Sequence, residues 1–206
     1  QIGWRKAAEK AGNLAFSATL SKPISLGEIQ IEAPGLQGVA VLGLTSQGKF
    51  ERADFKTLKI GKWLDAPVSL IGRGVAQPPE IIVNGGALDL RKLPKGGAGK
   101  GRNGPINVSL KRLKVARTIT LHNFKAKFAA GNGLKGAFSA RVNGAASVTG
   151  QITPQRGRSQ ILLQSKNAGA VLEAAGLFRK ASGGDLTLSL DPVGAAGHFD
   201  GKLKVT

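Results

Sequence analysis

The side chains that could carry out acid–base, nucleophilic or metal chemistry are few and scattered along the chain. His122 and His198 are far apart in sequence, and only Asp200, two residues after His198, stands close to either as a possible partner. A metal needs three or four ligands, and catalysis needs a base with an orienting group, so this pattern predicts neither. The chain has no Cys, which excludes disulfides, cysteine zinc sites and thiol nucleophiles. We therefore expect no enzyme activity, no metal and no cofactor.

A glycine-rich segment over residues 94–105 contains the pattern G-x-G-x-x-G at positions 99–104. A dinucleotide site would need a strand before this pattern and a helix starting on it, whereas Pro105 follows here. A phosphate-binding P-loop is also excluded, because Gly101 stands after Lys100 where Ser or Thr must hold magnesium. We expect a mobile loop or linker that divides the chain into segments 1–93 and 106–206.

The cations are the most distinctive charged feature. Thirty Lys and Arg against twelve Asp and Glu give a net charge of +18, which favours anionic partners. Three interpretations stay open: a solvated outer sheet face, attraction to anionic membrane headgroups, or nucleic-acid binding. Few aromatic residues and no basic helix stand against nucleic acid, and we expect none as a partner. The candidates for headgroup or anion binding are Lys111, Arg112, Lys114, Lys125 and Lys127.

The elements that must position these residues are strands, because apolar and polar residues alternate along most of the chain. Turn signals such as Asn84-Gly85-Gly86 and Asn143-Gly144 recur about every 8 to 12 residues between the alternating segments. The pattern predicts a mainly β protein with a many-stranded antiparallel sheet. The strands are expected around residues 14–20, 28–32, 39–44, 50–60, 68–71, 81–83, 88–90, 106–110, 119–124, 134–142, 147–152, 159–163, 186–190 and 203–205.

One segment has helical instead of strand periodicity. Residues 167–180 place Val171, Leu172 and Phe178 on one stripe, with Asn167 as the N-cap. We expect one short amphipathic helix whose stripe, Phe178 included, packs against the sheet.

The chain begins at Gln1 and contains no Met, which predicts a processed chain or a piece of a longer one. Its longest apolar run, residues 39–44, falls far short of the roughly 20 residues that a membrane-spanning helix needs. We expect no transmembrane segment and no signal peptide within these residues.

Four stretches resemble the AsmA-like family, in its YhdP-type branch. They are the run from Asn167 to Phe178 followed by Gly183-Gly184-Asp185-Leu186, the segment from Val83 to Arg91, the strands between Phe138 and Gly150, and His198-Phe199-Asp200-Gly201-Lys202-Leu203. These signatures belong to turns and strands and carry no catalytic residue, and together they cover about residues 65–206.

The resemblance implies an internal, periplasmic fragment of a large protein that is anchored in the inner membrane of a Gram-negative bacterium. It implies a sheet curled into an open groove that binds and conducts phospholipid acyl chains toward the outer membrane, a role in outer membrane biogenesis. The alternating pattern agrees, since a curled sheet with no second layer leaves its apolar face as a trough. The candidate lining residues are Ile29, Ile31, Ile119, Leu121, Leu186, Leu188 and Leu190.

Two other functions remain open from the sequence. The first is a basic structural or adhesive β-domain that contacts envelope polyanions, and the second is a nucleic-acid-binding β-domain.

Overall fold

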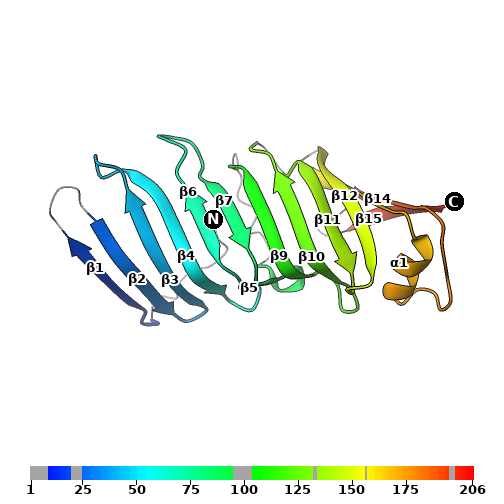
Figure 1. Ribbon diagram of the computed structural model, residues 1–206, viewed down its shortest axis with the longest axis horizontal. Coiled ribbons are helices and arrows are strands. Elements are labelled where there is room, and N and C mark those ends of the chain that lie inside the picture. The colour runs from blue at the N-terminus through cyan, green and yellow to red at the C-terminus, as the bar shows by residue number, and fades with distance from the viewer. Residues whose placement is uncertain (1–8, 20–24, 95–103, 132–133, 156, 195–197) are drawn as a thin grey trace.

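The computed structural model describes residues 9–19, 25–94, 104–131, 134–155, 157–194 and 198–206. Within these residues the protein is mainly β, with one large sheet, a short 3-10 helix and one α-helix (Figure 1). Most of the loop expected over residues 94–105 lies outside the described residues.

Fifteen strands make up the sheet in the described part of the chain. The first eight are β1 (Asn13–Thr19), β2 (Ser25–Ala33), β3 (Leu36–Leu44), β4 (Phe50–Ile60), β5 (Leu64–Asp65), β6 (Val68–Ile71), β7 (Glu80–Asn84) and β8 (Ala87–Asp89). After the 3-10 helix η1 (Leu90–Lys92) come β9 (Ile106–Lys114), β10 (Thr120–Phe128), β11 (Gly136–Val142), β12 (Ala146–Gln155), β13 (Arg158–Ser165), β14 (Leu186–Pro192) and β15 (Phe199–Val205). The α-helix α1 (Ala168–Ala174) lies between β13 and β14.

The strands follow one another across the sheet as an antiparallel meander, as predicted, except at one step. From β1 to β4 and from β9 to β15, each strand pairs with the next in antiparallel fashion. Between β4 and β9, β5 and β6 pair with β4, while β7 and β8 pair with β9 in parallel. A parallel step requires a connection of about a dozen residues or more, which residues 90–105 supply.

One face of the sheet is apolar along its entire width. A single line of directly paired residues runs across the sheet from β1 to β15, with one residue on each strand except the short strands β5 and β8. Every member is apolar or glycine, and we call this line the transverse row. It consists of Phe16, Ile29, Ala40, Phe55, Val68, Val83, Val108, Ala126, Phe138, Gly150, Leu163, Leu188 and Leu203. The adjacent line on the opposite face is polar from β7 to β15, with Asn84, Ser109, Lys125, Ser139, Thr149, Gln164, Thr187 and Lys204.

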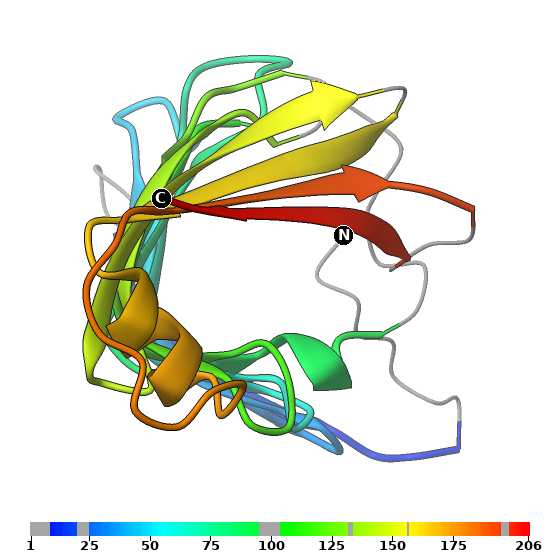
Figure 2. The same ribbon diagram turned by 90° about the vertical axis from the view of Figure 1, so that its right-hand side faces the viewer.

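The sheet curls into a trough, which Figure 2 shows end-on. The register shifts in the β1–β2, β3–β4 and β10–β11 pairs, where β2, β4 and β10 carry the extra residues, and Asn123 in β10 has a positive φ of 50°. Such bulges bend strands and increase their twist. Side chains on the inside of a curved sheet converge, so the buried alternating residues identify the apolar face as the concave one. We call the other face the outer face.

The helix α1 begins where the sequence predicts and ends earlier. The side chain of Asn167 accepts a hydrogen bond from the backbone N–H of Ala170 at 2.9 Å, as an N-cap does. The helix stops at Ala174 because Gly176 takes a positive φ of 74° and the N–H of Leu177 turns back to the carbonyl of Leu172.

Packing of α1 is therefore confirmed only in part. Val171 and Leu172 are buried, as expected, against the end of the apolar face. The expected packing of Phe178 is wrong: its side chain lies beyond the helix end and is 58% exposed.

Candidate functional site: an apolar trough and a basic outer face

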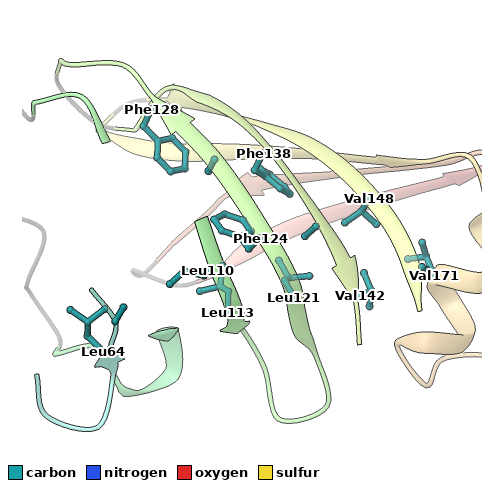
Figure 3. Packing of buried hydrophobic residues seen from close by; sticks show 14 of the residues in the cluster. Leu64, Leu110, Leu113, Leu121, Phe124, Phe128, Phe138, Val142, Val148 and Val171 are labelled. Atoms are coloured by element: carbon teal, nitrogen blue, oxygen red, sulfur yellow. The ribbon is translucent and has the colours of Figure 1, made fainter. Parts of the chain in front are cut away.

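The floor of the trough is built around two stacked phenylalanine rings. Phe124 and Phe138 lie with their ring centroids 5.7 Å apart, on neighbouring strands and on the same face as Leu121 and Val148 (Figure 3). Gly150 is the direct partner of Phe138 on β12, and its missing side chain leaves the space that the Phe138 ring occupies. The alternating sequence places all of these residues on one face.

The candidate lining residues all lie on the apolar face, but they differ in accessibility. Ile29, Ile31, Ile119, Leu188 and Leu190 are half-buried, so part of each side chain is accessible. Leu121 and Leu186 are only 8% and 2% exposed, because their side chains are packed within the buried cluster to which α1 also contributes. The sequence-based list of lining residues does not include Val83, Val108 and Leu163, which are half-buried members of the transverse row. Counting residue pairs outward from the connection between β12 and β13 could have placed Leu163 in this row. The pairing of Val83 with Val108 could not be found in this way, because β7 and β9 pair in parallel.

Both edges of the sheet carry exposed apolar side chains on the concave face. Leu14 and Phe16 on β1 are 62% and 60% exposed, and Leu203 and Val205 on β15 are 51% and 49% exposed. Each of these strands pairs with one neighbour only among the described residues. The apolar face therefore continues to both edge strands, where these side chains are exposed among the described residues.

The five candidate cations all lie on β9 and β10, and they form separate groups on the outer face. Lys125 and Lys127 border a shallow hollow together with Asn107 and Ser109. Arg112 and Lys114 line a different hollow, of about 400 Å³, together with Lys59 and Lys62. Lys111 is exposed beside Arg112, at a bulge where the backbone N–H groups of both residues donate to the carbonyl of Gly86.

The carboxylates of the outer face act mainly as ion-pair partners of the cations. Arg91 lies 2.6 Å from Asp89 and, through its hydrogen bonds, lowers the pKa of that carboxyl to about 2. Lys56 lies 3.2 Å from Glu28 and lowers its pKa, and Arg52 with Ser69 lowers the pKa of Asp54. Each of these carboxyls is thus held in its ionised form.

The histidines lie apart from one another. His122 pairs across the sheet with Arg112 and Arg141, and His198 is exposed before β15. Within the described residues, no group of three or more His, Asp or Glu side chains could hold a metal ion. None of the described helices is long and apolar enough to cross a membrane.

Comparison of the chain with protein-family models, with curated proteins and with solved structures found no match. The two faces of the sheet are therefore the features that bear on function.

Proposed function

We propose that the concave apolar face binds the acyl chains of phospholipids, and that the chain is a non-enzymatic β-groove segment of an AsmA-like envelope protein. The observation that carries this proposal is the transverse row, which runs across the sheet from β1 to β15 without a polar residue. Apart from α1 at one end, no second layer covers this face in the described part of the chain. Such an apolar face is expected to bind something apolar.

The dimensions of the face fit acyl chains. With strands about 4.8 Å apart, twelve spacings give the transverse row a length of roughly 58 Å. This exceeds the roughly 30 Å hydrocarbon thickness of a whole bilayer, so more than one chain can lie along it. Each methylene removed from water contributes about 0.8 kcal/mol, and a row without polar side chains offers no fixed stopping point. Such a surface suits movement of lipid along the trough.

The proposal places this segment in the periplasm, as part of a protein anchored in the inner membrane and conducting phospholipid toward the outer membrane. It is based on the resemblance described above together with the two-faced sheet. The basic outer face then meets water and anionic headgroups, while the acyl chains lie against the concave face.

Photo-crosslinking from neighbouring positions of β14 tests the proposal directly. Leu188 belongs to the transverse row, whereas Ser189 is the next residue and points to the outer face. A photoreactive amino acid at position 188 should give adducts with phospholipid in cells, and the same group at position 189 should not. Adducts from position 188 to protein alone would refute the groove and leave the basic structural β-domain.

A charge placed at the same two positions gives a second, independent measurement. Leu188→Asp puts a carboxylate on the half-buried concave face, where an acyl chain cannot compensate its desolvation. Co-purified phospholipid, measured by native mass spectrometry, should fall sharply in this variant and stay unchanged in the control Ser189→Asp. Equal lipid content in both variants would contradict the proposal.

A further inference from the structure

A hollow on the outer face brings together cations that are some fifty residues apart in sequence. It has a volume of about 400 Å³ and lies where the β4–β5 turn, β8 and the end of β9 meet. We call it the basic hollow, and its cations are Lys59, Lys62, Arg112 and Lys114.

The hollow exists because of one small residue in the pairing register. On the outer face, Lys59 pairs with Asp65, Asp65 with Ala87, and Ala87 with Arg112. The methyl group of Ala87 is the shortest side chain in this line, so it leaves space between its longer neighbours. Trp63 closes one side of that space, and the N–H of Asp89 donates to the carbonyl of Trp63 at 2.8 Å, which fixes the turn against β8.

The charges in the hollow are unbalanced. Two carboxylates line it, and both have partners: Asp65 lies 3.6 Å from Lys59, and Asp89 lies 2.6 Å from Arg91. Lys114 also acts electrostatically on Asp89. The side chains of Lys62 and Arg112 have no ion-pair or hydrogen-bond partner in the described part of the chain. Four cations and two carboxylates leave the lining with a net charge of +2.

We propose that the basic hollow binds a phosphate ester, with Arg112 and Lys62 as its main contacts. The planar guanidinium of Arg112 offers paired donors that match two phosphate oxygens, and Lys62 supplies a second positive charge from the facing turn. A volume of about 400 Å³ accommodates a headgroup or a small phosphorylated molecule. The two possible sources of this ligand, a phospholipid headgroup and a free phosphate ester, share the same chemistry.

This site is independent of the acyl-chain proposal, because it lies on the opposite face of the sheet. Arg112 and Lys114 flank Leu113, which points into the buried cluster of the concave face. Loss of the basic hollow should therefore leave the crosslinks from position 188 unchanged, and the two proposals can fail separately.

The fluorescence of Trp63 provides the measurement. The chain has two tryptophans, so Trp4→Phe leaves Trp63 as the single reporter beside the hollow. The single-tryptophan protein is titrated at fixed salt with glycerol 3-phosphate and, separately, with vesicles of phosphatidylethanolamine and phosphatidylglycerol. We expect a saturable change with at least one probe. Saturation by glycerol 3-phosphate identifies a free ester as sufficient, and saturation by vesicles alone identifies the lipid headgroup.

Four substitutions separate a shaped site from diffuse charge. Arg112→Gln should weaken binding about ten- to a hundredfold, as loss of a charge-assisted contact does, and Ala87→Leu should block binding by filling the hollow at unchanged net charge. Lys204→Gln removes one positive charge from the same face outside the hollow and should leave binding within about twofold. Lys62→Gln, on the exposed turn, should also weaken binding. It provides the test if Ala87→Leu lowers the melting temperature.

The proposal is overturned by any of three results. These are no saturable response to either probe, an equal weakening by Lys204→Gln and Arg112→Gln, or undiminished binding in folded Ala87→Leu and Lys62→Gln variants.

Discussion

The packing of Phe138 over Gly150 gives a prediction that can be worked out from the geometry of the trough floor. A β-carbon built at Gly150 overlaps the Phe138 ring and lies 2.5 Å from the carbonyl oxygen of Leu162. The ring could rotate only by disturbing its stack with Phe124, and the backbone oxygen cannot move without opening the β12–β13 ladder. Gly150→Ala should therefore strain the floor at two points.

Gly201 provides a matched control on the same face. It pairs with Leu190 on β14, and a β-carbon there meets only the tip of the Leu190 side chain at 3.4 Å. Both substitutions remove the same amount of backbone freedom from the unfolded chain, which by itself stabilises a protein by about 0.4–1 kcal/mol. The difference between the two variants thus isolates the packing effect at Gly150.

The expected magnitudes are well separated. Overpacking costs about 1–3 kcal/mol, so Gly150→Ala should melt about 2–12 °C below Gly201→Ala, at about 2–4 °C per kcal/mol for a chain of this length. Gly201→Ala should leave Tm unchanged or raise it by up to about 4 °C. Thermal unfolding followed by circular dichroism measures both. If Gly150→Ala melts at or above the temperature of Gly201→Ala, the Phe138 ring does not lie over Gly150 and the floor described above is wrong.

Three further predictions concern single contacts. The Asn143 side chain accepts a hydrogen bond from the N–H of Thr120 at 2.8 Å and donates to the carbonyls of Thr118 and Ala174 at 2.8 and 2.5 Å. Asn143→Gly keeps the positive φ of 46° and should lower the free energy of unfolding in urea titrations by about 1.5–4 kcal/mol. A loss below about 0.5 kcal/mol would show that these bonds do not tie α1 to the sheet. Arg91 lowers the pKa of Asp89 to about 2. The free energy of unfolding of the wild type should therefore exceed that of Arg91→Gln above about pH 4, and this excess should disappear as the pH falls from 4 to 2. A constant difference in unfolding free energy between pH 5 and pH 2 would refute the ion pair. Leu172→Ala should lower the free energy of unfolding by about 2–5 kcal/mol, because the Leu172 side chain is only 8% exposed. Phe178→Ala should lower it by less than about 0.5 kcal/mol, because Phe178 is 58% exposed. Equal melting temperatures of the two variants would contradict this placement of the helix end.

Strand identity was predictable from sequence because one buried face imposes a period of two on every strand. The expected segments at residues 50–60 and 68–71 coincide with β4 and β6. The turn at Asn143-Gly144 was also predictable, since both residues adopt the positive φ that this dipeptide favours. The two-residue strand β5 and the helix η1 were missed, because elements this short contain too few residues for a period to be visible.

The limits of prediction lie in long-range pairing. Nothing local distinguishes β9 as a parallel partner of β7 and β8, since this depends on how the connection returns to the start of β9. The same step brings Arg112 close to Lys59 and Lys62, so the basic hollow could not be read from the separate cation groups. The length of α1 was overestimated because the apolar stripe continues to Phe178, whereas the backbone leaves the helix at Gly176.

The two faces of this sheet explain each other. A single curved layer with exposed Phe16 and Leu203 at its open edges would be expected to associate with other copies through those edges. The outer face opposes this, because Lys202 and Lys204 lie on the edge strand β15 and the whole chain carries a charge of +18. Charge concentrated on the outer face leaves the transverse row free of polar side chains. The lipid trough proposed above requires this division, because its apolar face would stay open to water, whereas a sheet with an ordinary filled core would not require it.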